Sequence, residues 1–402
     1  MKFDVLIVGC GAQGSVIVSE LIKHPEVGKI KVADVDFKKA KKIAERINKK
    51  KISAYKVDAH NINEIAALSS DVDLIVNAVI PRFNLNIMHG ALKSGANYLD
   101  LAFGPPYNTL ESQLKLHRKF QNADLTALIC AGSAPGITNV LIAHAAEKLN
   151  SLDRILIRIF DHMQSKKFIL TWSPETLLGD MAENPIIYQN GKYIRVPTFS
   201  EEEIYNFPEP IGEQTVYAHV HEEVLTIPHF IGKDLRYMDL KLGGPDMPII
   251  KSMVELGICS TKPIDVNGVK VTPLDVLLKL LPPTLSLEEL ENMVKTGVII
   301  DAYECYVVTV EGTRLNKKIT YKFIVDFPKL REVQKWIPGA THESYVTGVS
   351  AAIFAKLLGE GKIKDKGVIS TECLDRDVRE TFLATLGQKG VKISQITKKQ
   401  LN

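Results

Sequence analysis

The stretch Val5-Leu6-Ile7-Val8-Gly9-Cys10-Gly11-Ala12-Gln13-Gly14 carries an apolar run directly into the pattern Gly-x-Gly-x-x-Gly. In a parallel α/β sheet, the first glycine of this pattern forms a tight turn and the second lets the backbone approach a pyrophosphate. The third lets the following helix pack closely on the strand, and the N-terminus of that helix faces the phosphates. The pattern therefore predicts a dinucleotide site, with expected contacts at Gly9, Gly11, Ala12, Gln13 and Gly14.

An acidic residue ends the next predicted strand. Lys31-Val32-Ala33 is followed by Asp34, about 20 residues beyond Gly14, where a ribose-binding acid is expected. A carboxylate accepts hydrogen bonds from a ribose 2′-hydroxyl and repels a 2′-phosphate, so Asp34 favours NAD over NADP. Lysines at positions 38, 39, 41 and 42 keep NADP open, although a run of lysines also fits the solvated face of a helix.

The composition is that of a globular protein large enough for two domains. The 402 residues are 45% hydrophobic and 24% charged, and the formal net charge is +3. This near balance gives no reason to expect nucleic acid, and no apolar run approaches the roughly 20 residues of a membrane span. We expect a cytoplasmic protein without a signal peptide, whose five widely spaced cysteines are free thiols.

Strand and helix signals alternate through the first third of the chain and predict an α/β fold, a Rossmann-type doubly wound parallel sheet, at residues 1–131. After Gly132 the strand candidates no longer alternate with regular helices, which predicts a second α+β domain for substrate binding and dimerisation at 132–345. The segment 346–402 is expected to pack back on the first domain. The strands predicted in the first domain are 4–8, 29–33, 53–57, 74–78, 97–101 and 125–130.

Ligands of doubly wound sheets bind at the carboxyl ends of the strands. Asn77 and Ala78 follow the fourth predicted strand, so we expect them to approach the nicotinamide half of the cofactor. The alternative for Asn77 is a polar turn before Pro81. Asp58 and Gly132 are assigned to the cofactor as well.

Several motifs extend the pattern beyond the first domain. The segment Ala131-Gly132-Ser133-Ala134-Pro135-Gly136-Ile137-Thr138-Asn139 has small residues before a predicted helix, so its amides can approach a ligand. Thr171-Trp172-Ser173-Pro174-Glu175, Asp234-Leu235-Arg236-Tyr237, Val266 to Leu277 and Gly367-Val368-Ile369 follow in order. Together these motifs resemble the saccharopine dehydrogenase-like reductases over the whole chain. Tyr237-Met238-Asp239-Leu240 and Cys130 depart from that pattern, which bears on the substrate.

The resemblance implies an NAD(P)-dependent oxidoreductase that acts on a carbon–nitrogen bond by hydride transfer. It favours saccharopine or lysine as the small-molecule substrate. One alternative is a polyamine-branch reductase resembling carboxynorspermidine dehydrogenase, with a more acidic pocket and NADPH. A homospermidine synthase-like transferase and a dinucleotide-binding protein without catalytic activity are further alternatives. We expect a homodimer.

Such a reaction requires a base and anchors for charged substrate groups. Asp100 ends the fifth predicted strand and is the candidate base, although it could instead cap the next loop. His162 follows a predicted strand and is a second catalytic candidate. Arg236, in the family-like segment, is the first choice to bind a carboxylate, with a surface ion pair as its alternative. The remaining substrate-binding candidates are Pro135, Gly136, Asn139 and Trp172.

The run His219-x-His221-Glu222-Glu223 also has the composition of a metal site. Alternating histidines face one side of a strand, and imidazole and carboxylate groups bind zinc. We nevertheless assign no metal, because no third ligand at a diagnostic spacing accompanies the two histidines.

Overall fold

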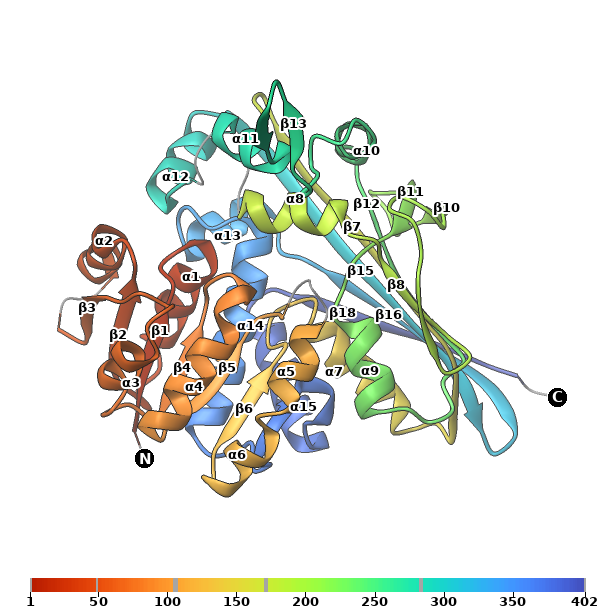
Figure 1. Ribbon diagram of the computed structural model, residues 1–402. Coiled ribbons are helices and arrows are strands. Elements are labelled where there is room, and N and C mark those ends of the chain that lie inside the picture. Colours follow the sequence, from red (N-terminus) through yellow and green to blue (C-terminus); the bar gives the residue numbers. More distant parts are fainter. Residues whose placement is uncertain (1, 48–49, 104–107, 170–172, 282–284, 401–402) are drawn as a thin grey trace. The chain divides into compact units, whose positions relative to one another are not determined.

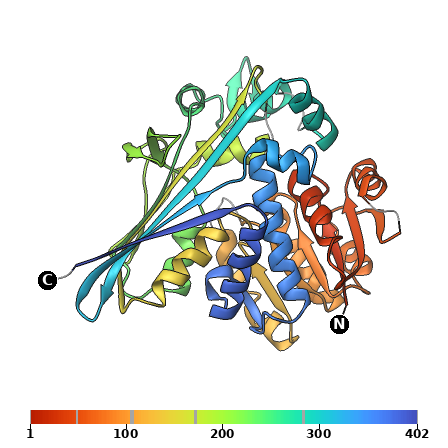
Figure 2. The same cartoon turned by 180° about the vertical axis from the view of Figure 1, so that it is seen from behind.

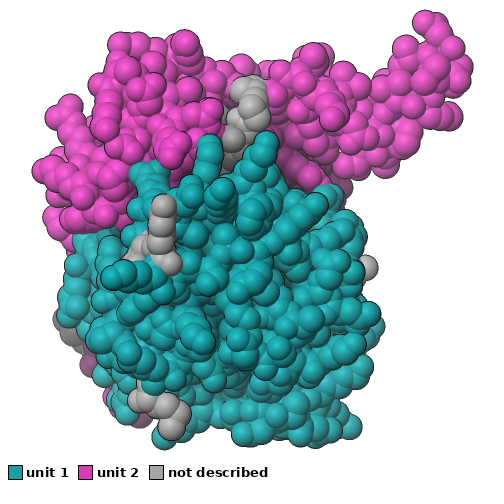
Figure 3. Space-filling view, turned by 90° about the vertical axis from the view of Figure 1, so that its left-hand side faces the viewer, with its two compact units in different colours: residues 1–144, 343–391 teal, residues 145–342, 392–402 magenta. Residues whose placement is uncertain are grey.

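The structure, a computed structural model, describes residues 2–47, 50–103, 108–169, 173–281 and 285–400. The chain forms two compact units, coloured separately in Figure 3. Unit 1 contains residues 1–144 and 343–391, and unit 2 contains residues 145–342 and 392–402. The boundary expected at residue 132 lies earlier than the observed one. The turn at this point is bound to the C-terminal part of unit 1, where the hydroxyls of Ser133 and Thr347 lie 2.7 Å apart.

Unit 1 is built on a seven-stranded parallel sheet in the order β17-β6-β5-β4-β1-β2-β3. Val5, Leu6 and Ile7 of the central strand are fully buried, as expected for a strand covered on both faces. This confirms the α/β fold class and the doubly wound sheet. The strands are β1 (Phe3–Val8), β2 (Val27–Asp34), β3 (Ile52–Lys56), β4 (Leu74–Asn77), β5 (Asn97–Asp100), β6 (Thr126–Ile129) and β17 (Gly367–Ser370).

Helices cover both faces of the unit 1 sheet. In Figure 1, α3, α4, α5 and α6 lie on the face turned to the viewer, and Figure 2 shows α14 and α15 on the opposite face. The helices are α1 (Ala12–Leu21), α2 (Phe37–Ile47), α3 (Ile62–Leu68), α4 (Asn84–Ser94), α5 (Asn108–Leu114), α6 (His117–Asn122), α7 (Ile137–Ala146), α14 (His342–Gly359) and α15 (Arg376–Gln388). Short 3-10 turns occur at Pro81–Phe83 and Thr371–Cys373.

The end of the chain is divided between the two units. Strand β17 extends the unit 1 sheet beside β6, and α15 belongs to the same unit. The final strand β18 (Lys392–Lys399) instead pairs antiparallel with β16 (Lys317–Asp326) of unit 2 over eight residue pairs. The expectation that the whole segment 346–402 packs on the first domain is therefore wrong for β18. Pairing with β18 satisfies the hydrogen-bonding groups along one edge of β16.

Unit 2 is built on a mixed nine-stranded sheet, which confirms the predicted α+β character of this part of the chain. At its centre the long strands β7 (Ser151–Ser165) and β15 (Ile299–Arg314) pair antiparallel, and β12 (Tyr237–Gly243) runs parallel to β7. Strand β11 (Glu213–Ala218) ends where the chain leaves the sheet, so His219 and His221 lie beyond this strand. The other strands of this sheet are β8 (Ile186–Gln189), β9 (Lys192–Arg195), β10 (Glu203–Asn206), β11 (Glu213–Ala218), β16 and β18.

The remaining elements of unit 2 surround this sheet. A separate hairpin consists of β13 (Ile264–Val266) and β14 (Val269–Val271). The helices are α8 (Pro174–Ala182), α9 (Glu223–Phe230), α10 (Met247–Glu255), α11 (Pro273–Leu280), α12 (Leu287–Lys295) and α13 (Leu330–Trp336). Among the residues that the structure describes, no helix combines the length and the apolar character that crossing a membrane requires.

Candidate functional site

The phosphate turn, residues 9–14, has the geometry that its glycines predict. Gly9 has a φ of +104°, and a Cβ at Gly9 would lie 2.6 Å from the carbonyl carbon of Ala78. A Cβ at Gly14 would lie 2.0 Å from the carbonyl oxygen of Gly9. A Cβ at Gly11, by contrast, would have no described protein atom within 4 Å. The turn thus packs tightly on one side and leaves its backbone open to a ligand at Gly11.

Helix α1 begins directly at this turn, with Ala12 and Gln13 in its first turn. No described side chain caps its N-terminus, where Gly11 is the N-cap residue. Backbone amides at a helix N-terminus are hydrogen-bond donors that attract anions. The arrangement therefore fits the pyrophosphate of a dinucleotide.

Asp34 lies at the carboxyl end of β2 and is tied to the phosphate turn. Its Oδ2 accepts a hydrogen bond of 2.8 Å from the backbone amide of Cys10, and its Oδ1 accepts one of 2.9 Å from that of Asp36. Each carboxylate oxygen can still accept a second donor, so Asp34 can bind a ribose hydroxyl. Burial, together with the negative charge of Asp34, raises the pKa of the Cys10 thiol well above its usual range, so Cys10 stays neutral and has no nucleophilic role here.

The other residues assigned to the cofactor differ in surroundings. Asn77 is buried and donates through Nδ2 to Asn84 Oδ1 at 2.8 Å and to Tyr98 at 2.9 Å, so it holds neighbouring elements in place. Ala78 stands against Gly9. Asp58 is exposed just beyond β3, and hydrogen bonds from His60 lower its pKa.

The Gly132–Asn139 turn is closed by its own side chains and backbone. The Gly132 amide donates to the carbonyl of Pro135 at 2.9 Å, and a Cβ at Gly136 would lie 2.0 Å from the carbonyl oxygen of Gly132. Asn139 is fully buried, accepts from the Gly136 amide at 2.9 Å and donates to Glu372 at 3.0 Å. Asn139 therefore positions the turn, and any contact of this turn with substrate involves its backbone.

Asp100 lies in the interior of unit 1 and is 1% exposed. Its oxygens accept hydrogen bonds from Gln113 at 2.7 Å, Tyr98 at 3.0 Å, the Cys130 amide at 3.0 Å and Asn84 at 3.3 Å. These donors come from β5, α4, α5 and the residue after β6, so the carboxylate joins several elements in the interior of the unit. The structure therefore favours a positioning role for Asp100 over that of a base.

An acid–imidazole cluster, in which His342 and Glu304 are buried and Asp161 is partly exposed, lies in unit 2. The Nε2 atom of His342 is 2.8 Å from Asp161 Oδ1 and 3.7 Å from Glu304 Oε2. Glu304 also accepts a hydrogen bond of 2.7 Å from Tyr306. No described residue hydrogen-bonds the Nδ1 atom of His342. The sequence did not indicate this cluster, because Asp161 and Glu304 become neighbours only through the register of β7 and β15.

His162 lies on the other face of the sheet. Side chains alternate along a strand, so Asp161 shares the face of Ile159. Ile159 stands beside Leu242 of β12, and Leu242 stands opposite Tyr217 of β11. His162 is instead 3.9 Å from Asp246. This separation from the acid–imidazole cluster disfavours the catalytic role predicted for His162.

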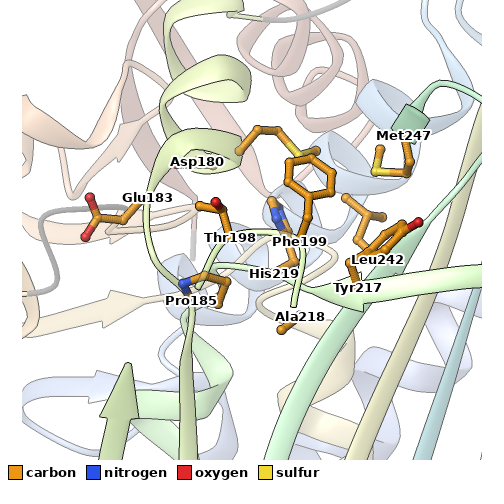
Figure 4. A pocket seen from close by; sticks show the side chains of 11 residues that line it. Asp180, Glu183, Pro185, Thr198, Phe199, Tyr217, Ala218, His219, Leu242 and Met247 are labelled. Atoms are coloured by element: carbon orange, nitrogen blue, oxygen red, sulfur yellow. The ribbon is translucent and has the colours of Figure 1, made fainter. Parts of the chain in front are cut away.

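A pocket opens on the same face as the cluster (Figure 4), and Leu242 and Tyr217 belong to its lining. Asp180 of α8 and His219, just beyond β11, provide polar groups. Burial, together with the charge of His221, lowers the pKa of His219 to about 3, so its ring is neutral at physiological pH. The pocket therefore combines apolar walls with an acid and a neutral imidazole.

Arg236 does not lie at this pocket. Its side chain is 69% exposed and forms an ion pair with Asp153 at 2.7 Å, which favours the alternative of a surface ion pair. Trp172, the other predicted contact in this half of the chain, lies outside the described residues.

The buried arginine of unit 2 is Arg158 of β7. Its guanidinium binds Asp239 through two hydrogen bonds, of 2.7 and 3.1 Å, and also binds Glu203 at 2.8 Å. Lys241 adds an ion pair of 2.9 Å to Glu203. Asp239 is one of the residues at which the sequence departs from the family pattern. In this network, the charge of its carboxylate is balanced by the guanidinium of Arg158. Arg158 is a charged residue within the apolar run 155–160, and this sequence signal could have indicated the network.

Two family models together match most of the chain. Residues 5–128 match the saccharopine dehydrogenase NADP binding domain, and residues 132–391 match the saccharopine dehydrogenase C-terminal domain. A carboxynorspermidine synthase of Vibrio alginolyticus is 28% identical over 96% of this chain and 95% of its own length. A carboxyaminopropylagmatine dehydrogenase of Synechocystis sp. is 26% identical, with 96% of each chain covered.

Among solved structures, the fold is similar to that of the apo histidine-tagged saccharopine dehydrogenase (L-Glu forming) from Saccharomyces cerevisiae. The TM-score is 0.69, the sequence identity is 15%, and the likeness covers 98% of this chain and 100% of the other. At this level of identity the likeness concerns the fold alone.

Proposed function

Since the chain belongs to the saccharopine dehydrogenase family of NAD(P)-dependent oxidoreductases, we propose that it reduces the imine formed between an amine and an amino-acid aldehyde. The product would be a carboxylated polyamine. The observation that carries this proposal is the likeness along 96% of the chain to a carboxynorspermidine synthase and a carboxyaminopropylagmatine dehydrogenase. It supports the polyamine alternative over saccharopine or lysine, which the sequence analysis favoured.

The lining of the pocket supports the same choice of substrate. The pocket on the unit 2 sheet contains Asp180, which is suited to a cationic amine. This fits the more acidic pocket that the polyamine alternative implies.

In the proposed reaction, the aldehyde and the amine condense to an imine with loss of water. When bound, a reduced nicotinamide would supply a hydride to the imine carbon. The π electron pair of the C=N bond moves to nitrogen, which takes up a proton. One imine, one reduced cofactor and one proton thus give one secondary amine and one oxidised cofactor.

Unit 1 residues would hold the cofactor. The amides at Gly11 and the start of α1 would bind the pyrophosphate, and Asp34 would bind the adenine ribose. Because a carboxylate repels a 2′-phosphate, we expect a lower KM for NADH than for NADPH.

The substrate test uses the purified full chain, 1,3-diaminopropane or agmatine as the amine, and 2-amino-4-oxobutanoate as the aldehyde. We expect oxidation of NADH or NADPH only when amine and aldehyde are both present, with the carboxylated secondary amine detected by mass spectrometry. Saccharopine oxidation without this activity would overturn the polyamine proposal. Amine exchange without net cofactor oxidation would indicate a transferase instead.

We assign the proton transfer to His342, oriented by Asp161. Exchange of His342 for Gln is expected to lower kcat by about 10²- to 10⁴-fold, because a positioned acid contributes that much, and to remove one limb of the pH profile. Cofactor affinity should not change. Because substitution of the buried His342 could impair folding, Asp161→Asn provides a second variant. The control is His229→Gln, which changes an exposed histidine of α9. Wild-type kcat and pH profile in both cluster variants would refute the assignment.

A further inference from the structure

A cluster of ionisable groups precedes helix α9. The Nδ1 atom of His221 lies 2.5 Å from Glu223 Oε2 and 3.6 Å from Glu222 Oε2, and both glutamates are buried. Burial disfavours a charged imidazole, but the carboxylates of Glu223, Glu222 and Asp180 outweigh it and raise the pKa of His221 to about 9. At neutral pH, His221 is therefore an imidazolium paired with Glu223.

Asp180 of α8 faces this cluster without a hydrogen-bond partner. Its Oδ1 atom is enclosed, and no described residue donates to it. Three charged side chains act on Asp180, and two of them, Glu222 and Glu183, are negative, whereas only His221 is positive. Burial and the charge of Glu222 raise the pKa of Asp180 well above its usual range. Enclosing a carboxyl group without a hydrogen-bond partner costs free energy. A positively charged donor bound beside Asp180 would remove this cost.

The pocket of Figure 4 provides space beside Asp180 for such a donor. His219 adds a neutral imidazole, and the walls include Met181, Phe199 and Tyr217. The Tyr217 ring already has the Lys251 ammonium 5.1 Å from its centre, so Asp180, and not this ring, is the partner offered to a substrate cation. The enclosed space is about the size of one water molecule, which fits the ammonium end of a chain.

We propose that this pocket binds the terminal ammonium group of the amine substrate, with Asp180 as its direct partner. The inference rests on the proposed function and names the part of the site that distinguishes a diamine from a monoamine. The pocket and the His342–Asp161 pair lie on the same face of the unit 2 sheet, as one elongated substrate requires. A divalent metal fits less well, because the Nδ1 atom of His221 is already held by Glu223.

The test compares 1,3-diaminopropane with propylamine, which has the same chain length but one amino group. In the wild type, we expect the diamine to have the lower KM by about 10- to 100-fold, which corresponds to one hydrogen bond to a charged group. Asp180→Asn should raise the KM of the diamine by a similar factor and leave that of propylamine unchanged. Glu175→Gln, the same change at an exposed residue of α8, is the matched control and should alter neither KM.

Calorimetric titration of the NAD⁺-bound protein with each amine tests the pocket independently of turnover. Diamine binding should release a proton from Asp180, and Asp180→Asn should lose both this release and about 10-fold or more in affinity. Equal diamine affinity in wild type and Asp180→Asn would overturn the inference. So would Asp180-dependent binding of Mn²⁺ without diamine binding. Diamine binding through Asp180 without turnover of any amine would refute the proposed function alone.

Discussion

Replacement of Gly14 by alanine is expected to weaken dinucleotide binding by about 100-fold. A Cβ at this position would lie 2.0 Å from the carbonyl oxygen of Gly9 and 3.0 Å from its carbonyl carbon. Both atoms belong to the backbone, so no side chain can rotate away, and the start of α1 must move from the turn. Overpacking of this kind costs about 1–3 kcal/mol, and the movement also displaces the amides that face the pyrophosphate. Titration of the protein with NADH, followed by nicotinamide fluorescence, measures the affinity.

A second glycine in a helix of unit 1 provides the control for this variant. Gly387 lies in α15, and a Cβ there would have no described atom within 4 Å. Gly387→Ala should therefore keep wild-type affinity and gain slightly in stability, because alanine is the better helix former. Wild-type affinity in Gly14→Ala would mean that residues 9–14 do not form the dinucleotide site.

Replacement of Arg158 by methionine is expected to lower the free energy of unfolding of unit 2 by about 3–5 kcal/mol. The change removes the bidentate partner of Asp239 and leaves this carboxylate, which is 1% exposed, with the Lys241 ammonium 3.8 Å away and the Tyr237 hydroxyl 3.1 Å away as its partners. Glu203 keeps its ion pair with Lys241, so the loss is concentrated at Asp239. Both tryptophans of the sequence fall within residues 145–342, so tryptophan fluorescence during urea unfolding reports on unit 2.

Arg236, an exposed arginine of unit 2, is the matched control for this experiment. Arg236→Met removes an ion pair to Asp153 at the surface, where such pairs contribute about 0–1 kcal/mol. The double variant Arg158→Met/Asp239→Leu should recover part of the stability, because no buried charge is left unpaired. Equal losses in Arg158→Met and Arg236→Met would contradict the importance that we assign to the buried network.

The sequence predicted the parts of the fold and site that depend on local patterns. The phosphate turn is contained in ten residues, and Asp34 is placed by the strand that follows it, so both were accessible from spacing alone. Strand β17 was not assigned to the sheet, because its four residues pair with β6 far away in the chain. Residues 108–122 form two helices, since α5 ends at Leu114 and α6 begins at His117, and no glycine or proline in this stretch indicates the break.

Residues that depend on tertiary pairing could not be placed in this way. The cluster of Asp161, Glu304 and His342 forms only when β7 and β15 pair in one register. Asp180 and His221 interact although they lie far apart in the sequence. The run at 219–223 indicated only the half of this cluster that contains His221. Arg236 was chosen from its motif, and Arg158 was not considered. Burial, which spacing does not reveal, distinguishes the two side chains.

The position of β17 in the chain bears on synthesis of the protein at the ribosome. The seventh strand of the unit 1 sheet is translated only after all residues from 145 to 342 of unit 2. Until then, β6 has an unpaired edge, which is a site for aggregation. The nascent N-terminal part must therefore persist as an incomplete sheet while unit 2 emerges. A fragment ending near residue 131 would remain in that condition permanently, and it would need residues 343–391 supplied by a linker to become a stable folding unit.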